Sequence, residues 1–457
     1  MRLGIDEEEW LIQVKDEALS LGEEMGDPVT PCIFCVPKTL VNENEAAYIP
    51  EIVSLGPFHC GKPELRGMEK YKAEAARRVS CRIQSSFPDK NFTDVVNSIM
   101  SMEHRIRACY DKEIHCSGEV LCWMMARDAS FLLEFFRNYN RPFQQEDREK
   151  DAAGSEYSHP VFCADGDNST VLAIIKDIMK LENQIPLFVL EQVLAVEMDS
   201  IKLAREQMEV ILKLLFDNIY RPFNFFIFST SPRRSHVLEM YHYSCFGKNS
   251  PMESSQDSWN PWPKALDDHR LKIPSAVKLT NAGVMFKANA GVLEEIKFDK
   301  ETCVLSLPLI ILNVESEVFI RNLIALELCS PQYKIKKFTQ YAQFMDDLIH
   351  NKKGVSVMRD KGVIVGNLRR YTQLARLWNS SNLSPALSQC VAIAETRKNI
   401  HEYYSKKWRI HYKTLWNEFW KAYVSKPWLV MGGVGAIIVL ILTVLQVVCL
   451  FYPCTPT

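Results

Sequence analysis

Apolar residues recur at helical spacing along most of the chain. Between residues 91 and 109 they fall every three or four positions, and from residue 120 to 139 they cover most of a helical circumference. The first pattern predicts an amphipathic helix and the second predicts a helix inside the core. The same spacing predicts further helices at 170–194, 201–217, 315–329 and 338–349. Pro186 breaks the first of these four, because proline lacks an amide hydrogen and crowds the preceding turn.

The spacing changes between residues 284 and 312. The segments VMFKA, EEIKFD and CVLSLPLIIL are short, rich in apolar residues and separated by turn-forming or charged residues. They predict a small antiparallel β-sheet of three strands near residues 284–312. Together these patterns indicate a fold that is mainly α, with a multi-helix core and one small sheet.

A long uncharged apolar segment lies close to the C-terminus. No charged residue occurs between Trp428 and Tyr452, and about 20 apolar residues suffice to cross a bilayer core. Trp428 at one end and Phe451 and Tyr452 at the other lie where interfacial aromatic residues belong. Residues 427–452 are therefore predicted to form a single transmembrane helix, which leaves a short tail at 453–457.

The flanking charges predict the orientation of this segment. Basic residues cluster on its N-terminal side at Lys406, Lys407, Arg409, Lys413, Lys421 and Lys426. The positive-inside rule then keeps the large domain in the cytosol and passes only the tail across the membrane. The start, MRLGIDEEEW, lacks the apolar h-region of a secretory signal peptide. N-glycosylation sequons, which often arise by chance, occur at Asn91, Asn168, Asn379 and Asn382.

Two features near the C-terminus each have two interpretations. Gly432 and Ala436 form a small-xxx-small pair that suits a homo-oligomer of spanning helices, although lipid also tolerates small residues. The basic, aromatic stretch at 401–424 either lies on the anionic cytosolic leaflet or extends the spanning helix. The expected partners are thus the lipid bilayer and an unidentified protein.

The composition is that of an ordinary packed protein, with 47% apolar and 24% charged residues among 457. The net charge of −2 gives no basic excess, so a nucleic-acid partner is not expected. The 14 cysteines lack the short secreted context of a disulfide scaffold and are expected to be mostly reduced and buried. We expect an acidic leader at 1–30 and one helical domain at 31–426, with polar insertions at 141–170 and 247–268.

The stretch SLGPFHCGKP, at 54–63, has the frame of a phosphate-binding loop. It matches G-x-x-x-x-G-K-[ST] except that Pro63 replaces the Ser or Thr whose hydroxyl holds magnesium. Pro57 and Pro63 each remove one N–H group from the backbone cradle that binds phosphate. The best candidate for a second metal carboxylate, Asp217, lies in a predicted helix. The stretch is therefore interpreted as a structural turn, and no nucleotide is expected.

Metal and thiol chemistry have little support. Cys32 and Cys35 form a CxxC pair, but a zinc site needs a second ligand pair at matching spacing. The next cysteines do not supply that spacing; they are Cys109, Cys116 and Cys122. His59 and Cys60 are adjacent in sequence, so their side chains are not expected to meet. No metal, cofactor-binding or catalytic residue is assigned.

Acid–base chemistry has only isolated candidates. Asp128 and Glu134 interrupt the apolar helix at 120–139 on opposing faces, and we interpret them as capping or hydrogen-bonded core groups. His236 and His242 flank Glu239, but their spacing places the two rings on different faces of a helix. The chain also lacks G-x-S-x-G, H-E-x-x-H, G-x-G-x-x-G and kinase signatures.

Longer motifs follow one another along the chain. They begin with VPKTLVNENEAAYIPEIVSLGPFHCGKPELRGMEKYK, MMARDASFLLEFF and LENQIPLFVLEQV, and continue with SHVLEMYH, IPSAVKLTNAGVMFK, FIRNLIALELC and YAQFMDDLI. KKWRIHYKTLW and YVSKPW complete a series that spans roughly residues 33–452. In content and order the series resembles the plant family called domain of unknown function 247. Cys35, in place of a basic residue, and residues 127–130, in place of an Asp-Gly-Cys pattern, depart from that family.

The resemblance implies a plant-specific, membrane-attached and mostly helical protein with no established catalytic activity. Some grass members of the family are associated with self-incompatibility, as pollen-side recognition determinants. In this interpretation SLGPFHCGKP is a family motif. No functional residues are established for the family, so none is carried over to this chain.

Two hypotheses for the function follow. The first is a non-enzymatic, membrane-anchored recognition or signalling protein, based on the anchor, the polar insertions and the lack of catalytic motifs. The second is an enzyme of unrecognised type with a site in the helical domain. The second requires at least two of four side chains to meet within hydrogen-bond reach in one pocket. These four are Asp128, Glu134, Glu182 and His236.

Overall fold

The computed structural model describes residues 30–139, 169–219, 235–246, 272–289, 291, 293–312, 316–349, 351–366, 390–419 and 427–451. The N-terminal half contains helices α2 (Lys38–Val41), α3 (Glu69–Ser86), α4 (Phe92–Met100), α5 (Glu103–Ala108), α6 (Gly118–Tyr139), α9 (Ser169–Ile178), α10 (Leu187–Met198) and α11 (Ile201–Asn218). The C-terminal half contains α12 (Val237–Ser244), α13 (Ala276–Asn281), α14 (Ser316–Cys329), α15 (Lys337–Ile349), α16 (Lys352–Asp360), α18 (Val391–Phe419) and α19 (Pro427–Phe451). Short 3₁₀ helices occur at Glu45–Ala47, Pro63–Met68 and Leu293–Glu295. The strands are β1 (Met285–Asn289), β2 (Lys297–Asp299), β3 (Val304–Pro308), β4 (Ile310–Ile311) and β5 (Ile364–Val365).

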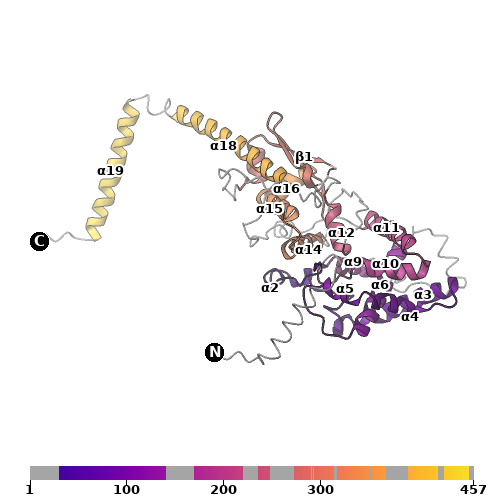
Figure 1. Ribbon diagram of the computed structural model, residues 1–457. Coiled ribbons are helices and arrows are strands. Elements are labelled where there is room, and N and C mark those ends of the chain that lie inside the picture. Colours follow the sequence, from indigo (N-terminus) through magenta and orange to yellow (C-terminus); the bar gives the residue numbers. More distant parts are fainter. Residues whose placement is uncertain are drawn as a thin grey trace, which may run out of the picture.

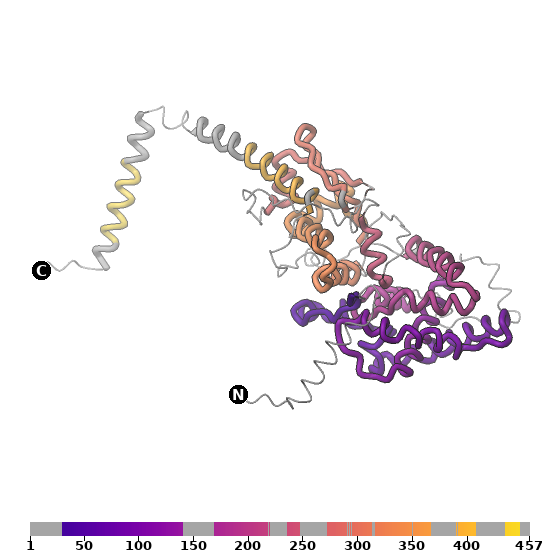
Figure 2. Tube along the Cα trace, in the orientation of Figure 1, coloured from indigo at the N-terminus to yellow at the C-terminus, as the bar shows by residue number. Residues whose placement is uncertain are grey.

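The helices gather in two regions (Figure 1). Helices α3, α4, α6 and α10 pack together at one end, while β1, α15, α16 and α18 lie toward the other. The first described segment, indigo in Figure 2, lies beside α14, far from it in sequence. Asn322 of α14 confirms this closeness, because its Nδ2 donates to the carbonyl of Ala47 at 2.8 Å.

Helix α6 lies at the centre of the first region and contacts α3, α4, α5, α10 and α11. It buries the rings of Phe131, Phe135 and Phe136, each of which stabilises the fold by about 1.5–3 kcal/mol. Phe135 stacks on Phe131 and Tyr139 with ring centroids 6.2 and 6.0 Å apart. The prediction of a core helix at 120–139 is confirmed.

The other helix predictions divide into two groups. Those at 201–217, 315–329 and 338–349 are confirmed as α11, α14 and α15. The single helix predicted at 91–109 is wrong, since Met102 leaves the helical conformation with φ −118° and ψ 17° between α4 and α5. The break predicted at Pro186 is confirmed, because α9 ends at Ile178 and α10 begins directly after the proline.

The main sheet is mixed, so the prediction of an antiparallel sheet is wrong. Strand β3 lies in the middle, antiparallel to β2 and parallel to β1. A simple meander would put β2 in the middle. Here β2 and β3 form an antiparallel hairpin. Strand β1 pairs with the other edge of β3 and runs parallel to it. In addition, β4 pairs in parallel with β5, which follows α16 in the chain.

Within the described part of the chain, no helix is both long and apolar enough to cross a membrane. Helix α19 spans Pro427–Phe451, but its side chains are described only at 435–447. Apart from a few edge residues, the predicted leader and the two polar insertions lie outside the described residues. So do the tail and three sequons, at Asn168, Asn379 and Asn382.

Segment 51–56 belongs to no sheet, and side chains satisfy its backbone. Three successive N–H groups, at residues 51–53, donate to the carboxylate of Asp177 at 2.7–2.9 Å. The N–H of Leu55 donates to Oδ1 of Asn183 at 2.7 Å. An unpaired buried donor costs about 1–3 kcal/mol, so these acceptors hold the segment against the turn between α9 and α10.

An ion pair extends this network to α3 and α6. Asp128 of α6 accepts from the N–H of Gly56 at 2.9 Å and binds Nζ of Lys72 at 2.7 Å. Lys72, on α3, also donates to the hydroxyl of Ser54 at 3.2 Å. Burial raises the pKa of Asp128 above its ordinary value, and Lys72 opposes that rise. Lys72 therefore ties α3, α6 and segment 51–56 together.

We expect Lys72→Met to lower the free energy of unfolding by about 3–5 kcal/mol, because it leaves the buried carboxylate of Asp128 unpaired. The double variant Lys72→Met/Asp128→Asn is expected to recover more than half of that loss. The amide oxygen introduced by Asp128→Asn can still accept from the N–H of Gly56, and no buried charge remains at the pair. Urea unfolding of the full-length chain gives both values.

Lys38→Met is the matched control, since Lys38 is exposed, and it is expected to change stability by less than about 0.5 kcal/mol. A double variant that is less stable than Lys72→Met alone, as expected when the two substitutions act independently, would contradict the pairing of Lys72 with Asp128.

Candidate functional site

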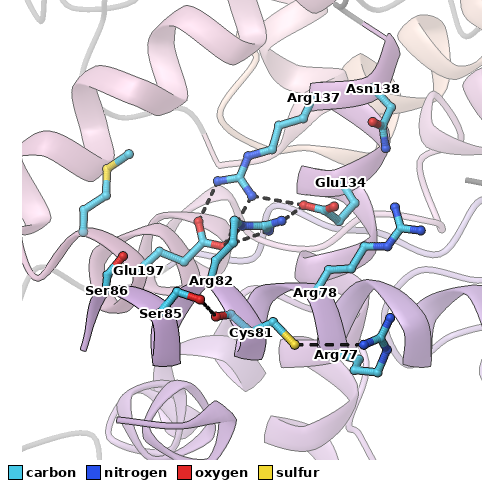
Figure 3. Close-up of a pocket in the computed structure, with 11 residues that line it drawn as sticks. Arg77, Arg78, Cys81, Arg82, Ser85, Ser86, Glu134, Arg137, Asn138 and Glu197 are labelled. Carbon is cyan, nitrogen blue, oxygen red and sulfur yellow. Dashed lines mark hydrogen bonds and ion pairs between the residues drawn. The ribbon is translucent and has the colours of Figure 1, made fainter. Parts of the chain in front are cut away.

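Helices α3, α6 and α10 border a cleft of about 660 Å³, shown in Figure 3. This volume lies in the range of pockets that hold small ligands, about 300–1,000 Å³. Charged side chains dominate its lining. The arginines are Arg77, Arg78, Arg82 and Arg137, and the carboxylates are Glu134 and Glu197.

The sequence of α3 explains why its arginines face the cleft. Ala75, Val79 and Ile83 recur every four residues and are fully buried against the core. Arg78 and Arg82 each directly precede a residue of this stripe, about 100° round the helix, so they lie at its border. Arg77, two residues before Val79, lies on the exposed side of the helix.

Two arginines and two glutamates form a closed network on the cleft wall (Figure 3). Arg82 donates to Glu134 at 2.6 Å and to Glu197 at 2.9 Å. Arg137 donates to the same two carboxylates, at 3.1 Å and 2.6 Å. The glutamate side chains are only 6% and 7% exposed. The network joins one residue of α3, two of α6 and one of α10.

The network shifts the pKa of Glu134 and of Arg137. Burial raises the pKa of Glu134, but the guanidinium groups of Arg82 and Arg137 outweigh burial and hold the pKa below its ordinary value. Burial lowers the pKa of Arg137, and the two glutamates more than reverse it. Glu134 is therefore ionised and engaged at neutral pH, so it is not available as a general base.

A second group of charges lies at the other end of the cleft. Arg77 donates two hydrogen bonds to Glu74, through Nε at 2.9 Å and Nη2 at 2.8 Å. Arg78 donates a third to Glu74 through Nε at 3.1 Å. The hydrogen bond from Arg77 lowers the pKa of Glu74 to about 2. The sulfur of Cys81 lies 4.0 Å from Nη1 of Arg77.

The four candidates for acid–base chemistry are not brought together. Only Glu134 lines the cleft. Asp128 is held by Lys72 and Gly56, as described above. Glu182 binds Nε2 of His59 at 2.9 Å and accepts from the N–H of Val36 at 2.7 Å. No hydrogen bond or ion pair joins any two of the four described side chains.

His236 is the fourth of these candidates. It is fully buried, and its Nε2 lies 3.0 Å from the carbonyl oxygen of Cys32. Burial lowers the pKa of His236, which favours the neutral ring. His242 lies 2.8 Å from Glu327, while Glu239 accepts from Gln332. His236 is the N-cap residue before α12 and His242 lies within it, and the two rings have different partners.

The structure confirms that SLGPFHCGKP is a structural turn. The N–H groups of Leu55 and Gly56, at the start of the stretch, donate to Asn183 and Asp128. Gly56 has φ +70°, and a Cβ atom there would lie 2.8 Å from the carbonyl oxygen of Gln184. Asp217, the candidate second carboxylate, lies on α11 as predicted.

No disulfide joins the described cysteines, but the expectation that most are buried is wrong for them, because five of the eleven are buried: Cys32, Cys109, Cys122, Cys245 and Cys390. Cys32 is buried and Cys35 is half-buried. Among the described residues, no three His, Cys, Asp or Glu side chains form a group that could hold a metal ion.

Sequence reasoning found Glu134 but missed its partners. Its partner Arg137 is only three residues away, but Arg82 and the second carboxylate, Glu197, lie far from it in the chain, on helices whose packing is not evident from spacing. The signal that could have found the cleft is the stretch EAARRVSCR, in which Arg78 and Arg82 are four residues apart and so share one helix face. Helix α3 starts at Glu69, directly after the 3₁₀ helix that contains Gly67.

A model of one family, described as plant protein of unknown function, matches residues 33–442 of the chain. The chain belongs to this family, DUF247. A putative UPF0481 protein of Arabidopsis thaliana is 27% identical, over 98% of this chain and 95% of the relative. A second UPF0481 protein of Arabidopsis thaliana is 22% identical, over 91% and 85%. No solved structure matches the chain.

For this DUF247 chain we expect Glu134→Gln to lower the free energy of unfolding by about 2–3 kcal/mol at neutral pH. Neutralising Glu134 removes one of two buried carboxylates that bind Arg82 and Arg137, which is destabilising. The loss is limited because both arginines still bind Glu197. The folded-state pKa of Glu134 lies below the unfolded value of about 4.3. The difference in free energy of unfolding between the unmodified chain and Glu134→Gln is therefore largest above about pH 5, and it falls as the pH drops below about 4.

Urea unfolding at neutral and acidic pH measures this difference. Glu301→Gln removes the same charge at an exposed position and is expected to change stability by less than about 0.5 kcal/mol. A difference between Glu134→Gln and the unmodified chain that does not vary with pH would contradict the network.

Proposed function

We propose that this DUF247 protein is a non-enzymatic recognition or signalling component that α19 anchors in a membrane. The observation that carries the proposal is the contrast between its candidate catalytic groups and its cleft. Asp128, Glu182 and His236 are engaged in separate structural contacts, whereas the cleft presents guanidinium groups whose chemistry is binding.

Three features support the anchor. The chain carries no charge from Trp428 to Tyr452. Helix α19 has 25 residues, so it is about 37 Å long and exceeds the hydrocarbon thickness of about 30 Å. Its described apolar side chains are exposed, for example Ile437 at 61% and Leu440 at 65%. A helix with such a surface is stable in lipid and unfavourable in water.

The orientation that we propose keeps the large domain in the cytosol. The basic residues that precede α19, and the lack of basic residues in the tail, support it through the positive-inside rule. Gly432 and Ala436 suit close contact between two copies of α19, so a homo-oligomer is part of the proposal. A more specific form of the proposal is recognition of the self-incompatibility type, the role with which some grass members of the family are associated.

Protease treatment of microsomes that carry the full-length chain tests the anchor and its orientation. We expect digestion of the large domain and no glycan at Asn91, Asn168 or Asn379, because the cytosolic face lacks the glycosylation machinery. A resident lumenal protein that stays protected is the control for membrane integrity. Protection of the large domain together with a glycan would overturn the cytosolic orientation, and release of the intact chain by carbonate would overturn the anchor.

A pull-down from solubilised plant membranes tests recognition. We expect the full-length chain to recover a protein partner in stoichiometric amount from tissue that expresses it. An unrelated soluble domain fused to residues 420–457 is the control for binding through the anchor alone. The recognition proposal fails when no partner exceeds this control.

A further inference from the structure

Two hydrogen-bond donors at one end of the cleft lack an acceptor among the described residues. Arg78 uses Nε for Glu74, which leaves its Nη1 and Nη2 without a protein partner in the described part of the chain. Nδ2 of Asn138 is buried and likewise has no acceptor there. Figure 3 shows both side chains on the same side of the cleft, next to Glu134.

These donors are costly to bury unless an acceptor joins them. The side chain of Arg78 is only 12% exposed, and a guanidinium group keeps its charge at any physiological pH. An unpaired buried amide donor is unfavourable for the same reason. The cleft is therefore built to receive oxygen acceptors from outside the described chain.

The charge balance of the cleft sets the sign of its ligand. Four guanidinium groups face the carboxylates of Glu134, Glu197 and Glu74, which leaves one net positive charge. Glu134 and Glu197 are occupied by Arg82 and Arg137, so the excess lies at the end that holds Arg77 and Arg78. A cation or a neutral sugar would leave that charge uncompensated.

We propose that this cleft binds a small ligand through an oxyanion, a phosphate or a carboxylate, held by Arg78 and Asn138. Arginine suits both groups because its planar fork donates two parallel hydrogen bonds to them. The cleft volume of about 660 Å³ leaves room for the rest of a small organic anion. The inference goes beyond the proposed function, because it holds whether or not the chain is anchored or has a protein partner.

Cys81 provides a direct test, since it lines the cleft and is exposed. The full-length chain in detergent is treated with N-ethylmaleimide, an uncharged thiol reagent, while inorganic phosphate or acetate is titrated at constant ionic strength. Mass spectrometry follows the modification of Cys81 relative to Cys60, the other exposed cysteine of the described chain. We expect at least one of the two anions to slow the modification of Cys81 severalfold without changing Cys60.

Variants separate a built site from general charge attraction. Arg78→Met is expected to weaken the protecting anion by about tenfold or more, and Asn138→Leu by a smaller factor. Arg66→Met removes the same charge from an exposed position outside the cleft and is expected to leave protection unchanged. Glu74 is the one hydrogen-bond and ion-pair partner of Arg78 in the described chain, so the Arg78→Met variant is expected to fold, and circular dichroism checks this.

The outcomes are distinct. Protection by phosphate alone, lost in Arg78→Met, identifies a phosphate site; protection by acetate alone, with the same loss, identifies a carboxylate site. Protection by both anions with that loss supports the oxyanion site in its general form. Absence of protection by either anion, or equal protection in Arg78→Met and Arg66→Met, overturns the inference.

Discussion

The buried backbone of segment 51–56 is the constraint on which much of the fold depends. The segment passes through the core without a neighbouring strand, so side chains must accept its N–H groups. Asp177, Asn183 and Asp128 do so, and they come from the end of α9, the turn before α10 and the middle of α6. Any shift of these elements would leave a buried donor unpaired.

The same constraint determines where the cleft lies. Asp128 is negative and buried, so it needs a cation, and Lys72 supplies it from the first turn of α3. This contact fixes the rotation of α3 about its axis against α6. The apolar stripe of α3 then faces inward, and its arginines face the ends of α6 and α10. The position of the cleft is thus a consequence of the pairing within the core.

Sequence spacing could predict those parts of the fold whose signal is local. The apolar circumference of α6 and the proline before α10 are examples, since each depends on a few neighbouring residues. The direction of β1 could not be predicted in this way, because it depends on which edge of β3 was free. The cleft needed both kinds of information. Glu134 was recognisable as an unusual carboxylate, but Arg82 of α3 and Glu197 of α10, which complete its network with Arg137, meet it only through tertiary packing.

The place of the cleft in the molecule bears on the source of its ligand. Helix α18, which precedes α19, packs on β2 and α15, toward the opposite end from α3, α6 and α10 (Figure 1). In an anchored chain, the route to the membrane therefore leaves from the end that lacks the cleft. An anion dissolved in the aqueous phase can reach the cleft without passing that end, so the architecture is compatible with a soluble ligand for the guanidinium groups of α3.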